Sequence, residues 1–225
     1  MTVLHLADEG EAADLAAFLS RLIHYDRGAA VRLQAAGTAL AVFGRPPSFE
    51  VLAIRAVRLA KPYENGLDVT LDVTVSAGEF LESVDESAGM AVVPAAVTGP
   101  PWAGVLPPRG GWRPEPGLPE PDALRAMVAA GVTEFRSRTG ELADERRTRA
   151  ELDRIGREIW SRAVGTTGLP VRAVHAAQSL GFLRPTQSAG APVLISSGAW
   201  LRLRTPYGSI AVRRAGLGTL DVSVR

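Results

Sequence analysis

Residues 67–76 read Leu67-Asp68-Val69-Thr70-Leu71-Asp72-Val73-Thr74-Val75-Ser76, with an apolar side chain at every second position. A β-strand sends successive side chains to opposite faces, so this alternation predicts a strand with one apolar and one polar face. The wider segment 29–76 predicts four successive strands that end with this one. The apolar face of these strands needs a cover, and we expect most of the remaining elements to provide it.

Three shorter patterns precede that strand, at about 29–36, 38–44 and 49–60. The tight connection near Gly37 favours antiparallel pairing, and Asn65-Gly66 is a turn signal before the fourth strand. Part of segment 49–60 is apolar on both faces, which is typical of a central strand.

Helices are predicted on both sides of this β segment. Residues 9–27 place apolar side chains at helical spacing, with Asp8 as the N-cap. Residues 77–87 predict a short helix, and residues 90–93 predict one more strand.

Residues 94–121, which we call the strap, hold nine of the 16 prolines and five glycines. Proline fixes φ and removes an amide donor, so we expect neither a long helix nor a central strand here. Trp102 and Trp112 lie in the strap, and a free linker rarely carries two such large rings. We therefore predict that the strap lies on the folded body with both indoles at least half buried. Docking of a partner is the alternative reading of these tryptophans.

The C-terminal half predicts helices from Pro121 to about Gly140, onward to about Ala163, and over residues 170–180. Several opposite charges lie four residues apart between Glu134 and Glu158, and such pairs stabilise an exposed helix. Residues 200–213 predict a β-hairpin that turns at Thr205-Pro-Tyr-Gly208, and residues 217–224 predict a third strand.

These elements predict an α+β fold, with mainly antiparallel sheet or sheets packed against helices. We expect a helix plus antiparallel β-meander at 1–93, the strap at 94–121, and a helical segment plus C-terminal β-hairpin at 122–225. The three parts are compatible with one composite domain. The two β segments are compatible either with one shared sheet or with two separate sheets.

The composition bounds the function. The 225-residue chain has a net charge of +1, which gives no bulk electrostatic attraction to nucleic acid or to an anionic membrane. Cysteine is absent, which excludes disulfides and thiolate chemistry. The chain shows no signal-peptide pattern and no apolar run of membrane-spanning length, so we expect a soluble cytoplasmic protein.

The sequence contains no catalytic or cofactor-binding motif. His5, His24 and His175 are far apart, so no local zinc motif exists, and His175 is expected to be a packed or surface residue. Asp68 and Asp72 share a strand face at roughly 13 Å, too far for a glycosidase pair, and are expected to face water or an arginine of a neighbouring strand. We therefore expect no cofactor and no metal, and whether the protein is an enzyme stays open.

The strongest candidate binding residues are arginines and tryptophans. Arg202 and Arg204 share one strand face, Arg213 and Arg214 end the paired strand, and Trp200 and Tyr207 are close by. Such a cluster binds phosphate or stacks bases, although a hairpin with one wet face has the same pattern. The residues selected for contact with a ligand or partner are Arg27, Arg32, Trp102, Arg109, Trp112, Arg113, Arg202, Arg204 and Arg213.

Three stretches together carry a resemblance that covers most of the chain: Leu19-x-x-Leu22 to Arg32-Leu33, Leu106-Pro-Pro-Arg-Gly-Gly-Trp112, and Trp200-Leu-Arg-Leu-Arg204. With them the chain resembles a family of uncharacterised proteins restricted to actinobacteria. The resemblance implies a cytoplasmic location and supplies no activity, cofactor or catalytic residue.

Two functional hypotheses follow. The first is a non-enzymatic binding or regulatory protein that acts through a protein partner, or as a homo-oligomer. The second is an enzyme or binder of an anionic small molecule, a nucleotide or sugar phosphate, held bidentately by arginines.

Overall fold

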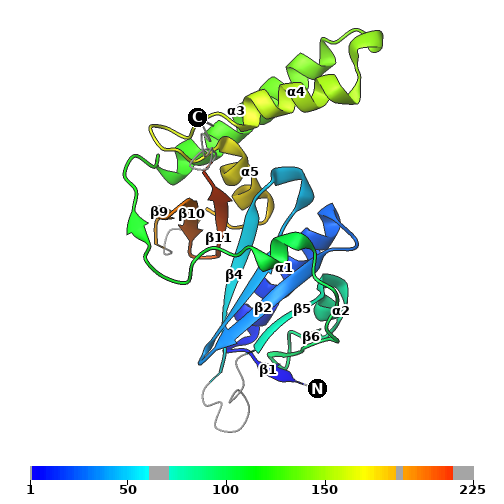
Figure 1. Ribbon diagram of the computed structural model, residues 1–225, viewed down its shortest axis with the longest axis vertical. Coiled ribbons are helices and arrows are strands. Elements are labelled where there is room, and N and C mark those ends of the chain that lie inside the picture. The colour runs from blue at the N-terminus through cyan, green and yellow to red at the C-terminus, as the bar shows by residue number, and fades with distance from the viewer. Residues whose placement is uncertain (1, 61–70, 186–189, 215–225) are drawn as a thin grey trace, which may run out of the picture.

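The computed structural model describes residues 2–60, 71–185 and 190–214. The predicted α+β class is confirmed, because helices pack on antiparallel sheets (Figure 1). The helices are α1 (Glu9–Tyr25), α2 (Ala77–Glu82), α3 (Pro121–Gly140), α4 (Arg149–Trp160) and α5 (Val171–Ser179), with short 3₁₀ turns η1 (Pro47–Phe49), η2 (Pro101–Gly104) and η3 (Asp144–Arg146). The strands are β1 (Val3–His5), β2 (Ala30–Ala36), β3 (Ala39–Gly44), β4 (Leu52–Arg58), β5 (Leu71–Ser76), β6 (Val84–Asp85), β7 (Met90–Val92), β8 (Arg113–Pro114), β9 (Val193–Ser197), β10 (Trp200–Thr205) and β11 (Gly208–Arg213).

One eight-stranded antiparallel sheet unites the two β segments of the chain. Its order is β5-β2-β3-β4-β11-β10-β9-β8, and the register at the junction places Leu52 of β4 opposite Ala211 of β11. Strands β2, β3 and β4 follow one another as a meander, whereas β5 pairs with β2 on the far side. A second, three-stranded sheet has the order β1-β7-β6.

The alternating pattern forms a strand wherever the structure describes it. Val75 of β5 is fully buried, while Asp72 lies exposed on the other face. Residues 67–70 of the pattern, with Asp68, lie outside the described residues. The predicted turn at Asn65-Gly66 and the predicted strand at 217–224 also lie outside them.

Helices α1, α2 and α5 cover one face of the large sheet and enclose the main core. Asp8 is the N-cap of α1, as predicted, because its carboxylate accepts a hydrogen bond from the Glu11 amide at 2.8 Å. Phe18 of α1 stacks on Phe182, which follows α5, with 5.6 Å between the ring centroids. The N- and C-terminal halves therefore share one hydrophobic core.

The strap covers part of the opposite face of the sheet. Phe43, Leu52, Ile54 and Ala211 form a smaller apolar cluster there, against which Trp102, Leu106 and Trp200 pack. Trp102 and Trp112 are each more than half buried, so the predicted burial of both indoles is confirmed. The strap adds only η2 and the two-residue edge strand β8.

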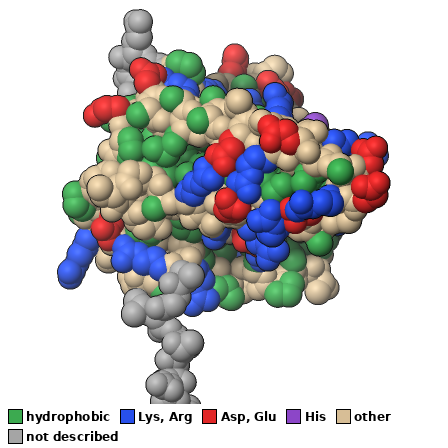
Figure 2. All heavy atoms as spheres, turned by 90° about the horizontal axis from the view of Figure 1, so that it is seen from above, with side chains coloured by type: hydrophobic (Ala, Val, Ile, Leu, Met, Phe, Trp, Pro, Cys, Tyr) green, Lys and Arg blue, Asp and Glu red, His purple; other side chains and the backbone are tan. Residues whose placement is uncertain are grey.

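Helices α3 and α4 form a hairpin, which we call the arm, that projects from the body (Figure 1). The predicted pairs Glu134–Arg138 and Arg154–Glu158 are present on its surface. Ion pairs also join the two helices, because Arg138 bonds Glu158 at 2.8 Å and Arg162, just after α4, bonds Glu134 at 2.7 Å. In Figure 2, acidic and basic side chains are interspersed at this end of the molecule.

Several strands differ from prediction: residues 84–85 form β6 although the helix was expected to extend over 77–87, and β1 and β8 were not predicted. Segment 49–60 forms a shorter strand, because Pro47–Phe49 makes a 3₁₀ turn before β4 begins at Leu52. Strand β9 was not predicted, because Ser196 and Ser197 obscure the apolar alternation of a five-residue segment that pairs with β10.

Candidate functional site

The candidate Arg32 is a structural residue beneath the strap. Its Nε donates to Asp72 Oδ1 at 2.7 Å and its Nη2 to Asp72 Oδ2 at 3.0 Å. Its Nη1 donates to the carbonyl of Ala103 in η2. The Arg32 hydrogen bonds hold the pKa of Asp72 below its usual range, and the charge of Arg109 adds to this effect. The expectation that Asp72 faces an arginine of a neighbouring strand is therefore confirmed.

Arg202 and Trp112 form a second structural contact between strap and sheet. The Arg202 guanidinium lies over the Trp112 ring, 5.7 Å from its centroid, and the Trp112 Nε1 donates to the Pro108 carbonyl at 3.0 Å. Burial lowers the pKa of Arg202, and the charge of Arg204 lowers it further. Arg109 and Arg202 line a cavity of about 260 Å³ between the strap and the sheet.

The structure does not bring all nine candidates together. The side chains of Arg27, Arg113 and Arg204 are exposed. Two of the candidates, Trp102 and Arg213, share a pocket with other charged side chains.

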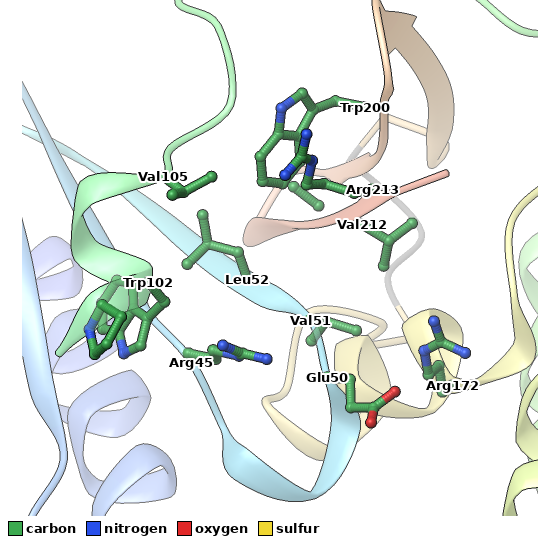
Figure 3. A pocket seen from close by; sticks show the side chains of 12 residues that line it. Arg45, Glu50, Val51, Leu52, Trp102, Val105, Arg172, Trp200, Val212 and Arg213 are labelled. Atoms are coloured by element: carbon green, nitrogen blue, oxygen red, sulfur yellow. The ribbon is translucent and has the colours of Figure 1, made fainter. Parts of the chain in front are cut away.

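We call this cavity the tryptophan pocket (Figure 3); its volume is about 460 Å³. It lies where the beginning of β4 meets the end of β11, with the strap on one side and the first turn of α5 on another. Its apolar lining includes Val51, Leu52, Val105 and Val212, its indoles are Trp102 and Trp200, and its charged residues are Arg45, Glu50, Arg172 and Arg213. The two indoles stand apart, with Leu52 between them in Figure 3.

The pocket carries an excess of positive charge. Within the described ranges, no ion pair involves Arg45, Arg172 or Arg213. The Nε of Arg172 is buried and has no hydrogen-bond partner in the described part of the chain. Arg213 lies across the β10–β11 ladder from Trp200, with its guanidinium 5.9 Å from the ring centroid. Unpaired guanidinium groups beside indoles are suited to an anion with a flat or apolar portion.

Glu50 adds backbone strain to the rim of the pocket. Its φ of 52° is left-handed, and among the described residues no other non-glycine residue has a positive φ. A left-handed conformation costs a residue with a Cβ roughly 1–2 kcal/mol. Such strain often occurs at binding sites, and here it places a carboxylate on the pocket lining, at the end of the cavity where Arg45 and Arg172 lie (Figure 3).

A second cavity, which we call the polar pocket, lies on the other side of Trp102. Its volume is about 720 Å³, and Arg45 and Trp102 line both cavities. Asp26, Ser76 and Thr98 contribute polar side chains. The exposed apolar side chains of Val97 and Val105 lie at the polar and tryptophan pockets respectively.

Sequence reasoning missed four charged or aromatic residues of the tryptophan pocket as site residues: Arg45, Glu50, Arg172 and Trp200. Alternation along the hairpin places Trp200 on the same face as Arg202, and it was noted there only as a neighbour of the basic cluster. Arg45, Glu50 and Arg172 carry no local signal, because their meeting depends on the pairing of β4 with β11.

The described residues offer no other recognisable chemistry. Within residues 2–60, 71–185 and 190–214, no three His, Asp or Glu side chains are grouped to hold a metal ion. His175 is a packed residue, as expected, 5.1 Å from the Phe49 ring and 4.5 Å from the Trp160 ring. In the same part of the chain, no helix has the length and apolarity to cross a bilayer.

The fold and pocket define an α+β protein whose single large sheet joins two sequence segments, with a candidate ligand pocket at their junction. Residues 1–104 match the family described as Domain of unknown function (DUF8010), and residues 107–217 match Domain of unknown function (DUF8185). No curated protein matches the chain. The two matches agree with the resemblance to uncharacterised proteins.

The division between the two family matches runs through the pocket. Arg45, Glu50 and Trp102 come from the segment that matches the first family, whereas Arg172 and Arg213 come from the second. Both matched segments therefore contribute side chains to the pocket.

Proposed function

We propose that the protein binds an anionic small molecule in the tryptophan pocket. The observation that carries this proposal is that Arg45, Arg172 and Arg213, none of them in an ion pair among the described residues, line one cavity with an apolar floor. Arg45 and Arg213 are exposed and Arg172 is partly exposed, so a ligand in the cavity can reach these side chains. Arginines that line a concave, partly apolar cavity favour an anion, because a guanidinium donates two parallel hydrogen bonds to a phosphate or carboxylate.

A thermal-shift screen tests this proposal. Pyrophosphate, nucleotides and sugar phosphates are added to the full chain, because a ligand at one hundred times its dissociation constant adds about 2.7 kcal/mol to stability. We expect at least one of these anions to raise Tm in the wild type and to raise it much less in Arg172→Gln. Flat melting curves for all of them would refute the proposal for these ligand classes.

The arm favours a second candidate function, binding of a protein partner. Beyond its contacts with α5 it projects from the body, and its faces carry exposed charges of both signs (Figures 1 and 2). Arg136 and Arg149 are exposed there and make no interhelical ion pair in the described structure. This charged surface of the arm supports the hypothesis that the protein is regulatory and binds a protein partner, or forms a homo-oligomer.

The partner hypothesis is tested by affinity capture at low salt. The doubly reversed variant Arg136→Glu/Arg149→Glu serves as the matched comparison. A stoichiometric partner captured by the wild type and lost with the variant supports it. Recovery of no stoichiometric partner by the wild type, or equal capture by both proteins, contradicts it.

We place this activity in the cytoplasm of an actinobacterium. The support is compositional: the chain lacks cysteine, and it is rich in Ala, Gly, Pro and Arg, all encoded by GC-rich codons. Of its 25 basic residues, only Lys61 is a lysine.

A further inference from the structure

We propose that the anionic ligand is a nucleoside phosphate, with its base against the apolar floor and indoles of the tryptophan pocket and its phosphate held by the arginines. This inference rests on the proposed function and adds the class of the ligand. Arginines alone bind nucleotides, sugar phosphates and inorganic anions without distinction. The apolar and aromatic part of the pocket is what favours a nucleotide over the other two classes.

The apolar half of the pocket is the first reason. Val105 is the exposed apolar side chain of this lining, and the buried side chains of Leu52 and Val212 lie beside it. An inorganic anion or a sugar phosphate would leave Val105 uncovered. Val105 is 50% exposed. Exposed apolar side chains within a concave site are typical of a surface that a ligand covers.

The indoles are the second reason. Trp102 and Trp200 both line the pocket and are only partly buried. A nucleobase stacks on an indole without requiring a particular pattern of hydrogen bonds, and such stacking contributes substantially to affinity. Trp200 already holds the Arg213 guanidinium at 5.9 Å, so a base on Trp200 and a phosphate on Arg213 would be neighbours.

The charges complete the match. The pocket has three positive charges, on Arg45, Arg172 and Arg213, and one negative charge, on Glu50. This excess of positive charge suits a phosphate with more than one negative charge. Arg172 is partly exposed and makes no ion pair among the described residues, so a phosphate would supply the charge partner that its guanidinium lacks. The Glu50 carboxylate accepts hydrogen bonds only, so it fits an amino group of a base or a ribose hydroxyl. The cavity of about 460 Å³ lies in the usual range for small-molecule sites.

Equilibrium titration on the full chain, followed by tryptophan fluorescence, tests the inference. The probes are AMP, GMP, ribose 5-phosphate, adenosine and pyrophosphate. We expect at least one nucleoside phosphate to quench fluorescence and to bind about tenfold or more tightly than ribose 5-phosphate or pyrophosphate, because only the nucleotide carries a base that stacks. Adenosine should bind more weakly than AMP, because it lacks the charge.

Trp200→Leu and Trp200→Phe separate stacking from general packing. The leucine variant should lose most of the preference for the nucleotide over ribose 5-phosphate, whereas the phenylalanine variant should retain it. If the leucine variant fails to fold, comparing the probes on the wild type and on Trp200→Phe still shows whether an aromatic ring at position 200 gives the preference for the nucleotide.

The outcomes distinguish this inference from the proposed function. Equal binding of AMP, GMP and ribose 5-phosphate, without quenching, overturns the nucleotide assignment and leaves anion binding intact. Binding of none of the five probes overturns both.

Discussion

The Arg55 guanidinium on β4 donates from its Nη1 to the backbone carbonyl of Tyr207, in the turn between β10 and β11, at 2.7 Å. Its Nη2 donates to Glu11 of α1 at 2.9 Å, and the side chain is almost fully buried. One cation therefore ties the first helix and the fourth strand to the C-terminal hairpin. The hydrogen bond between Arg55 and Tyr207 therefore joins the segment that matches the first family to the segment that matches the second.

Arg55→Met should lower the free energy of unfolding by about 3 kcal/mol, because the Tyr207 carbonyl loses its donor and Glu11 keeps only the exposed Arg58 as an ion-pair partner. Urea denaturation measures the loss. Arg58→Met is the matched control, since Arg58 also bonds Glu11 but its side chain is 71% exposed. We expect a much smaller loss there. Equal losses in the two variants would show that burial of the Arg55 pair does not matter.

Trp112→Ala should destabilise the fold by about 3 kcal/mol, because the Trp112 indole is mostly buried, contacts the Arg202 guanidinium and donates a hydrogen bond to the Pro108 carbonyl. Urea titration again provides the measurement. An unchanged midpoint with an unchanged slope would contradict a structural strap and would favour Trp112 as a docking residue instead.

The pH dependence of stability should report on His175. Burial between Phe49 and Trp160 holds its pKa below the ordinary value of 6.5. Above that pH both the folded and unfolded chains keep this imidazole neutral. Below pH 6.5 the imidazole of the unfolded chain takes up a proton more readily than that of the folded chain. The free energy of unfolding therefore decreases as the pH is lowered.

The wild-type urea midpoint should therefore drop from pH 7.5 to pH 5.5 more steeply than that of His175→Gln. The difference between the two proteins isolates this histidine from other titrating groups. Parallel pH profiles would mean that His175 accepts a proton as readily in the folded protein as in the unfolded chain.

Local patterns predicted much of this fold, because alternation and helical spacing are properties of neighbouring residues. Asp8 as the N-cap of α1, the alternation at Leu71–Ser76 and the hairpin turn after Thr205 are examples. Pairing between distant strands was not predictable in the same way. Nothing near Leu52 indicates that it lies opposite Ala211, or that β5 returns to β2.

The candidate site depended on this long-range pairing. Arg32 was a reasonable candidate on its strand, but the return of β5 places Asp72 against it and uses its charge for structure. Arg45 and Arg172 belong to a turn after β3 and to α5, so they meet only because β4 joins β11. Residue type suggested arginines as ligand contacts, whereas tertiary structure decided which ones remained unpaired.

Calorimetric titration of pyrophosphate into three proteins tests anion binding at the tryptophan pocket most directly. The proteins are the wild type, Arg172→Gln and Arg204→Gln, where Arg204 is an exposed arginine outside the pocket. We expect saturable binding to the wild type and to Arg204→Gln with similar affinity. Binding to Arg172→Gln should be about tenfold weaker or more, because a charged hydrogen bond contributes about 1.5–3 kcal/mol. Equal affinity in all three proteins, or no binding of pyrophosphate or of any nucleotide to the wild type, would contradict the assignment of the pocket.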